Sequence, residues 1–189
     1  KKILFGHLYR LENKTILYEC IGAPLAVLSL ERLIASRAKE IIMLGFCGSL
    51  NPEIQIMEVV SIQKAISEEG TSKHYFSRKD IFYPSPTLKK RIENTLSSMK
   101  LPFLNGTIVS TDAPYRETKS WLAEKQKKGI DFVDMETSAV LALAHFHDIK
   151  AAALMIVSDE LSHDGWEIGF SNSKLDERIN RYFLPFLTD

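Results

Sequence analysis

Two carboxylates, Asp134 and Glu136, stand two residues apart in the segment FVDMETSAV, where only small or apolar residues follow them. A carboxylate left in an apolar setting without a partner costs several kcal/mol, so such a pair has strong donors nearby or a ligand to bind. On an extended backbone the two side chains point to the same side, whereas on a helix they diverge. Two interpretations stay open: both face a binding crevice, or they cap and charge the start of the following helix.

Residues with hydrogen-bonding or reactive side chains also end three other apolar runs of the chain. These are GFCG at 45–48, STD at 110–112 and SD at 158–159. Ligands of open α/β sheets bind at the carboxyl ends of the strands. We therefore expect these three segments to meet the paired carboxylates at one crevice.

The elements that must position these residues follow an α/β pattern, because short apolar runs alternate with amphipathic segments. The first residues predict a two-stranded hairpin around the turn at 12–14. Strands are expected at about 41–44, 58–69, 107–110, 130–133 and 151–157. Helices are expected at about 24–38, 85–99, 119–128, 137–147 and 173–184. The first helix is predicted to bury Leu25, Leu28, Leu33 and Ile34, and the helix from Thr137 is apolar nearly all round and hence buried.

Length and composition bound the class of protein. With 189 residues, 45% of them hydrophobic, the chain can bury a full core and is predicted to form one domain, 1–189. The 24 Lys and Arg residues balance 24 Asp and Glu residues, so binding to nucleic acid or to a membrane surface has no electrostatic support. No apolar run reaches the roughly 18 residues that span a bilayer, and the start lacks signal-peptide features. We expect a soluble, cytoplasmic protein.

The two cysteines, Cys20 and Cys47, form neither a metal-ligand spacing nor a disulfide framework, which is typical of a reducing compartment. No spacing in the chain implies a metal or an organic cofactor. Cys47 and His74 could suggest a nucleophile and its base. However, GFCG lacks the G-x-S-x-G spacing, so a small buried thiol is the favoured interpretation of Cys47.

Five motifs identify a resemblance that covers nearly the whole chain, from about Gly22 to the C-terminal helix. They are GFCG, EGTSKHY, STDAPYRE, VDME and VSD, in this order along the sequence. Their order and spacing resemble the nucleoside phosphorylase superfamily, which contains hexameric purine nucleoside phosphorylase, uridine phosphorylase and methylthioadenosine/S-adenosylhomocysteine nucleosidase. The resemblance implies a three-layer α/β/α fold with a central twisted mixed sheet and a homo-oligomer. It also implies cleavage of the N-glycosidic bond of a nucleoside by phosphate or water.

The resemblance assigns the chemistry to two carboxylates. Glu136 is expected to accept hydrogen bonds from the ribose hydroxyls. Asp159 is expected to be the general acid that donates to a purine ring nitrogen, with Ser158 orienting it. The alternative for Asp159 is a cap on the turn that leads toward Trp166. Ser158 and Asp159 favour a purine over a pyrimidine and leave the 5′-substituent open.

The resemblance also implies which residues bind the substrate: Cys47, Gly48, Val133, Asp134, Met135, Ser158, Tyr115 and Arg116. Met135 is expected to pack on the sugar, and Cys47 and Gly48 to lie against the base. Pro114 stands where relatives often have a phenylalanine against the base. His74 stays open between the site and a subunit contact.

Two departures from the family pattern concern phosphate, the expected co-substrate of a phosphorylase. A phosphate dianion needs concentrated positive charge, ideally an arginine, with hydroxyl or backbone donors beside it. Phosphorylases carry an arginine and a serine or threonine where this chain has Met43 and Phe46. The first strand and phosphate loop of the family are also expected to be lacking upstream of Lys1. Three alternatives stay open: phosphorolysis, hydrolysis, and a nucleoside-binding protein that does no chemistry.

Overall fold

A computed structural model describes residues 7–162 and 165–188 of the protein. Its helices are α1 (Ala23–Ala35), α2 (Pro86–Ser98), α3 (Lys119–Lys127), α4 (Thr137–Phe146) and α5 (Leu175–Leu187), with two short 3-10 helices, η1 (Thr71–His74) and η2 (Pro114–Arg116). Its strands are β1 (His7–Arg10), β2 (Thr15–Tyr18), β3 (Glu40–Ser49), β4 (Val59–Ser67), β5 (Ile81–Phe82), β6 (Leu104–Ser110), β7 (Phe132–Asp134), β8 (Lys150–Ser162) and β9 (Gly165–Ile168). The alternation of helices and strands confirms the predicted α/β class.

Seven of these strands form one mixed sheet in the order β5-β4-β6-β7-β3-β8-β9, while β1 and β2 form the predicted separate hairpin. Strand β3 runs parallel to β8 along its whole length but antiparallel to β7. Strand β4 pairs with β6 and also with β8, so the sheet curls back on itself. The predicted mixed sheet is therefore confirmed, and one of its changes of direction, between β7 and β3, lies beside the candidate site.

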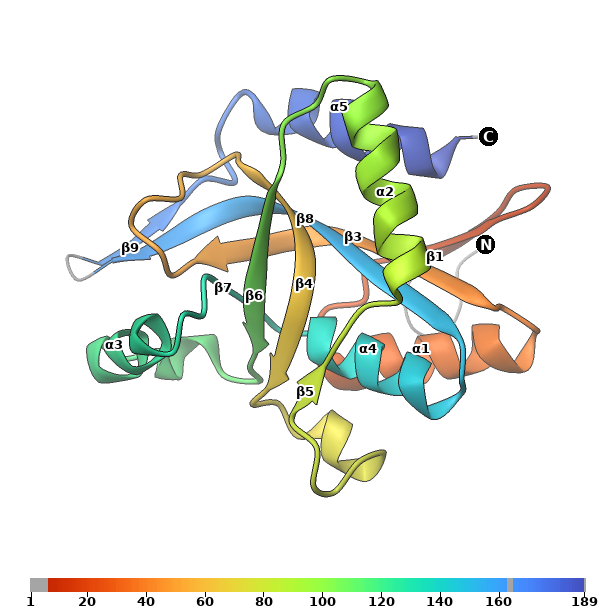
Figure 1. The fold of residues 1–189 in the computed structure, drawn as a ribbon, viewed down its shortest axis with the longest axis horizontal. Coiled ribbons are helices and arrows are strands. Elements are labelled where there is room, and N and C mark those ends of the chain that lie inside the picture. The colour runs from red at the N-terminus through yellow and green to blue at the C-terminus, as the bar shows by residue number, and fades with distance from the viewer. Residues whose placement is uncertain (1–6, 163–164, 189) are drawn as a thin grey trace.

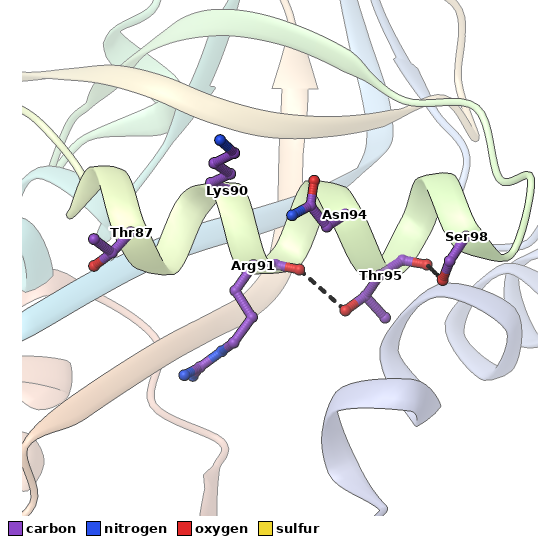
Figure 2. Close-up of a pocket in the computed structure, with 6 residues that line it drawn as sticks. All are labelled: Thr87, Lys90, Arg91, Asn94, Thr95 and Ser98. Atoms are coloured by element: carbon purple, nitrogen blue, oxygen red, sulfur yellow. Dashed lines mark hydrogen bonds between the residues drawn. The ribbon is translucent and has the colours of Figure 1, made fainter.

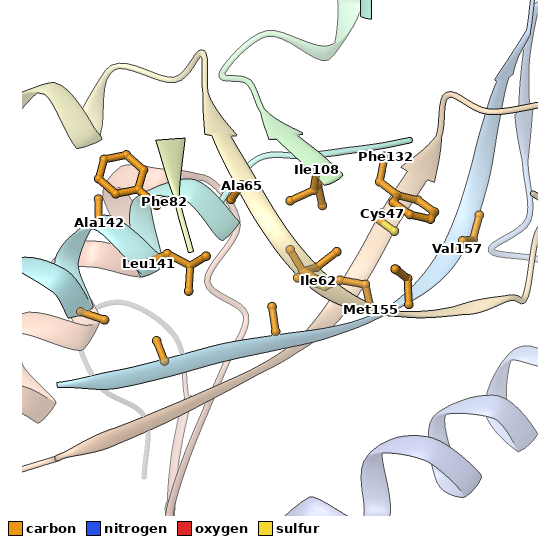
Figure 3. Close-up of a cluster of buried hydrophobic side chains, with 14 residues drawn as sticks. Cys47, Ile62, Ala65, Phe82, Ile108, Phe132, Leu141, Ala142, Met155 and Val157 are labelled. Carbon is orange, nitrogen blue, oxygen red and sulfur yellow. The ribbon is translucent and has the colours of Figure 1, made fainter. Parts of the chain in front are cut away.

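Helices cover both sides of the sheet, with α2 and α5 above it and α1, α3 and α4 below it in Figure 1. Under α2 and α5, a core cluster includes Leu88, Leu96 and Tyr182. A second cluster connects the sheet to α4 and includes Ile62, labelled in Figure 3, and Leu141. These two cores separate three layers, as expected. None of the described helices is long and apolar enough to cross a membrane.

Helix α4 is buried along most of its length, as its composition predicts. Every residue from Thr137 to Ala144 is buried, with α1 on one side and the sheet on the other. Burial of apolar area contributes roughly 25 cal/mol per Å², so this helix is held by packing more than by helix propensity. Its first turn therefore has a fixed place relative to the strand ends.

The predicted inward stripe of α1 is wrong at Leu28, which is 47% exposed. The buried face includes the smaller side chains Ala23, Ala26 and Val27, of which Ala23 and Val27 pack with Ala139 and Leu143 of α4. Small residues let two helices approach closely, and this contact turns Leu28 outward. The helix also ends at residue 35, earlier than predicted.

Strands β3 and β8 are both longer than the sequence predicts. The apolar run of β3 ends before its two glycines, yet the strand continues to Ser49 because it pairs with β8 throughout. Strand β9 was not predicted at all. All four of its residues are exposed, so the alternation of buried and exposed side chains that marks a strand in a sequence is missing. The strand is held by antiparallel pairing with β8.

Candidate active site

Gly48 is the point where three of the motifs meet. It pairs with Val133 on β7 and with Asp159 on β8. A β-carbon at this position would lie 2.9 Å from Asp159 Oδ2 and 3.1 Å from Val133 Cγ1. Because real side chains do not approach so closely, glycine is what allows the ends of β3, β7 and β8 to gather. The expected convergence of strand ends is present here.

Asp134 ends β7 and uses both carboxylate oxygens within the protein. Oδ1 accepts from Ser110 Oγ at 2.6 Å, and Oδ2 accepts from Thr137 N at 2.8 Å and from Thr137 Oγ1 at 2.5 Å. Burial raises the pKa of Asp134, although these donors oppose the shift. This is the helix-capping arrangement, one of the two interpretations of the sequence; contact of Asp134 with a substrate stays a prediction.

Glu136 is half-buried and lies where the strand has already given way to the helix. Its Oε1 accepts from the backbone N–H of Gly22, and its Oε2 accepts from Met135 N at 3.3 Å. The two carboxylates thus bond to different elements, because the extended backbone that would point both to one side ends at Asp134. Burial and the neighbouring charge of Asp134 raise the pKa of Glu136 to about 7. Glu136 therefore changes charge near neutral pH.

Asp159 is held by two donors from opposite sides. Its Oδ1 accepts from Ser158 Oγ at 2.6 Å and its Oδ2 accepts from Trp166 Nε1 at 2.6 Å. Ser158 thus contacts Asp159 directly, and its role in orienting Asp159 stays a prediction. Trp166 lies on β9 and was not among the predicted site residues, since no pattern in the sequence marked β9 as a strand.

Glu117 is a second residue that sequence reasoning missed, although it belongs to the STDAPYRE motif. It directly follows η2, whose Tyr115 ring lies 6.4 Å from the Trp166 ring in an edge-to-face contact. Burial and the charge of Asp159 raise the pKa of Glu117 to about 7. Of the three consecutive residues, the predicted Tyr115 is 89% exposed and Arg116 is also exposed, whereas Glu117 is turned inward.

Cys47 is only 2% exposed and belongs to the core cluster of Figure 3. Burial raises the pKa of its thiol well above the usual value, and the charges of Asp134 and Asp159 add to this shift. The reactive thiolate is therefore disfavoured, which confirms the interpretation of Cys47 as a buried thiol. Its predicted place against a base stays a prediction, as do those of Gly48, Val133 and Met135.

The two residues that replace phosphate ligands of the family both pack in apolar surroundings. Met43 lies against the core cluster of Figure 3, with its Sδ 3.7 Å from Thr137 Oγ1. The ring of Phe46 contacts the rings of Phe170 and Phe183. Neither side chain can donate a hydrogen bond to an anion. Within residues 7–162 and 165–188, no group of three or more His, Cys, Asp or Glu side chains could hold a metal ion.

Two hollows lie elsewhere on the surface. The one in Figure 2, of about 510 Å³, is lined by α2 alone, and its Arg91 bonds to Glu40 at the amino end of β3, away from the candidate site. The other, also about 510 Å³, lies between α1 and η1. It includes His74 and Pro24, and Pro24 is two residues beyond the Gly22 that bonds Glu136. The second hollow is therefore the one adjacent to the candidate site.

Comparison with known proteins gives one consistent family. A family model described as "Phosphorylase superfamily" matches residues 2–187. Uncharacterized protein R802 of Acanthamoeba polyphaga mimivirus is 34% identical over 177 residues, which are 92% of this chain and 67% of that protein. A guanosine phosphorylase of Halorubrum lacusprofundi is 27% identical over 164 residues, which are 87% of this chain and 68% of that protein.

A solved structure has the same fold. Purine nucleoside phosphorylase from Toxoplasma gondii, in complex with immucillin-H, superposes with a TM-score of 0.81 at 24% identity, over 90% of this chain and 71% of that one. The chain thus spans about two thirds of the length of the two sequence relatives it matches.

Proposed function

Because this chain belongs to the phosphorylase superfamily, we propose that it is an enzyme that cleaves the N-glycosidic bond of a purine nucleoside. The observation that carries the proposal is the convergence at Gly48, which pairs with Val133, just before the segment of Glu136, and with Asp159. Asp159 on β8 and Glu136, two residues beyond the end of β7, thus lie on segments that are joined at Gly48, close to strand ends, where α/β proteins bind ligands. The relative named guanosine phosphorylase supports a purine.

Each carboxylate has a distinct part in the proposed reaction. Cleavage is eased when the departing base gains a proton and when the sugar, which becomes oxocarbenium-like, is held firmly. Asp159, oriented by Ser158, donates a proton to a purine ring nitrogen as the bond to the anomeric carbon breaks. Ionised Glu136 accepts hydrogen bonds from the ribose hydroxyls, and its negative charge favours the developing positive charge on the sugar.

The remaining predicted contacts are part of the same proposal. Met135 packs on the sugar, and Cys47, Gly48 and the backbone of Val133 line the base. Asp134 contributes mainly by capping α4, since both of its oxygens already accept hydrogen bonds. The exposed Tyr115 and Arg116 approach the base from η2, and the ring contact of Tyr115 with Trp166 supports this. No metal or organic cofactor is needed for this chemistry, and in phosphorolysis phosphate is a co-substrate.

The nucleophile that completes the reaction is phosphate or water, and the structure favours water. A phosphorylase must neutralise a dianion, but Met43 and Phe46 are apolar, partly buried and packed against the core clusters. Water needs no such charge. In hydrolysis the oxygen of water adds to the anomeric carbon, and the proton that this water releases restores the acid form of Asp159.

We further propose that the chain acts as a single domain, in nucleoside salvage in the cytoplasm and as a homo-oligomer. Large apolar side chains that remain exposed in the described chain, such as Ile21, Trp166 and Ile168, support association with further copies.

The experiment that tests the proposed function is incubation with inosine, guanosine, adenosine, methylthioadenosine and uridine, with and without phosphate. Free base, free sugar and sugar 1-phosphate are assayed separately. Release of base without phosphate identifies a nucleosidase, and phosphate-dependent release with sugar 1-phosphate identifies a phosphorylase. If a folded protein binds a nucleoside but releases no base, the proposal is wrong and the chain is a nucleoside-binding protein.

A further inference from the structure

Glu69 is a fully buried carboxylate that the proposed reaction does not use. It lies two residues beyond the end of β4 and is 0% exposed. Within the described part of the chain, no Lys, Arg or His forms an ion pair with it. A buried carboxylate without a cation is costly unless hydrogen-bond donors replace its hydration. Its partners should therefore explain why a charge is placed there.

Three serines supply those donors. Ser67 Oγ donates at 2.8 Å and Ser138 Oγ at 2.9 Å, both to Oε1, while Ser72 donates its N–H to Oε2 at 2.9 Å and its hydroxyl to Oε1. Burial by itself favours the protonated form, but the donors outweigh it and hold the pKa of Glu69 below its usual value. Glu69 is therefore an ionised acceptor at neutral pH.

One of these serines leads directly to the candidate site. Ser138 is in the first turn of α4, and its backbone N–H donates to Ser110 Oγ at 2.9 Å. Ser110 in turn donates to Asp134 Oδ1 at 2.6 Å, and Asp134 accepts from Thr137. The first turn of α4 is thus bound to two buried carboxylates, Asp134 from β7 and Glu69 from the end of β4.

Glu136 is the residue immediately before this doubly held turn. Its backbone carbonyl accepts the N–H of Val140 at 3.0 Å, so its main chain is part of the same turn. Its carboxylate accepts hydrogen bonds from two backbone N–H groups, those of Gly22 and Met135. The place of the Glu136 side chain therefore depends on the place of the turn that follows it.

We infer that Glu69 is a positioning residue, which fixes the first turn of α4 through Ser138 and thereby sets the place of the Glu136 carboxylate. The role of Glu136 toward ribose rests on the proposed function, whereas the hold on the turn does not. A misplacement of about 1 Å can lower a rate about a hundredfold, so a rigid support for this carboxylate has a kinetic effect as well as a structural one.

The structure offers a matched pair of variants for the test. Ser138→Ala and Ser67→Ala each remove one hydroxyl that donates to Glu69 Oε1, at nearly equal distances. Both serines are buried, but only Ser138 belongs to α4. If Glu69 had only a structural role, both variants should lose similar thermal stability. They should then not differ in kinetics or in local hydrogen exchange.

The measurements are kcat and KM for the best nucleoside and hydrogen exchange of the segment 134–146. We expect Ser138→Ala to lower kcat/KM about tenfold and to speed exchange of the segment, with Ser67→Ala within about twofold of wild type in both. Glu69→Gln, which removes the charge at similar size, should resemble Ser138→Ala. Equal behaviour of the two serine variants, in kinetics and in exchange, would overturn the inference.

The exchange measurement separates this inference from the proposed function. If the wild-type protein cleaves no nucleoside, the proposed function fails, yet faster exchange in Ser138→Ala alone still supports the hold of Glu69 on α4. If nucleosides are cleaved but the segment exchanges alike in all variants and kcat/KM does not change, the proposed function stands and the inference fails.

Discussion

Trp166 donates its indole N–H to Asp159 at 2.6 Å, from a strand that packs at the edge of the sheet. The bond stabilises the carboxylate that forms when Asp159 gives up its proton. It should therefore stabilise the transition state of the proposed reaction as well as the resting protein. A hydrogen bond to a charged group contributes about 1.5–3 kcal/mol. β9 therefore has a direct link to the proposed chemistry.

Trp166→Phe should lower kcat/KM about tenfold to a hundredfold, because it removes this donor while keeping an aromatic ring against Tyr115. Steady-state kinetics with the best purine nucleoside measures it. The control is Trp121→Phe on α3, where the indole N–H donates to Glu68 at 2.9 Å, away from Asp159. Equal kinetics for the two variants would remove Trp166 from the site.

Asp159→Asn should lower kcat for purine nucleosides by about two orders of magnitude or more, because the amide cannot give a proton to the base. Asparagine keeps an oxygen that can accept from Trp166, so the fold and the binding of nucleoside should change little. Rapid-quench kinetics and calorimetric binding are measured on the same sample. Near-normal turnover with intact binding would refute the assignment of Asp159 as the acid.

Sequence patterns predicted most of the fold, because much of the core is built from strands and helices with clear apolar periodicity. The buried helix from Thr137, the hairpin at the start and the strands around residues 107–110 and 151–157 all follow from such patterns. The face of α1 was mispredicted at Leu28 because the smaller Ala23 and Val27 make the buried contact with α4. Periodicity reports the size of apolar side chains, whereas close helix packing depends on small ones.

The candidate site was less predictable than the fold. The motifs indicated Asp134, Glu136 and Asp159. They did not indicate that both carboxylate oxygens of Asp134 accept hydrogen bonds from Ser110 and Thr137. Those bonds depend on the parallel register of β6 and β7, which pairs Ser110 with Asp134. Trp166 and Glu117 were not predicted because their importance comes from their interactions with Asp159, which the sequence alone does not display.

The activity of the protein should rise as the pH increases through about 7. Burial and the charge of Asp134 raise the pKa of Glu136 to about 7, and only its ionised form accepts hydrogen bonds at both oxygens from ribose. The dependence of kcat/KM on pH measures this. In Glu136→Gln that rise should disappear and KM for nucleosides should increase about tenfold. A rise near pH 7 that persists in the variant would assign the titration to another group.

Glu117→Gln should stabilise the protein at pH 8 but not at pH 4. Burial and the charge of Asp159 raise the pKa of Glu117 to about 7, so the folded protein binds more protons than the unfolded chain between the ordinary value and 7. The contribution of Glu117 is therefore lost as the pH rises through this window, and glutamine, which never ionises, avoids the loss. Melting temperatures across this range measure the difference.

The exposed Glu167 of β9 provides the control, because Glu167→Gln removes an equal charge without a buried carboxyl group. Its melting temperature should follow that of the wild-type protein at every pH. If both glutamine variants change stability alike, the effect comes from net charge and Glu117 is not specifically coupled to Asp159.

Gly48→Ala should be the most damaging small substitution in the site. Its methyl group would lie 2.9 Å from Asp159 Oδ2 and 3.1 Å from Val133 Cγ1, so β3, β7 or β8 must shift. Gly45→Ala, on the same strand, meets only the flexible Met155 side chain at 3.2 Å. We expect Gly48→Ala to lower kcat/KM at least about a hundredfold, and Gly45→Ala to change it within about threefold. Similar kinetics for the two variants would mean that the joined strand ends do not form the site, since only Gly48 lies where they meet.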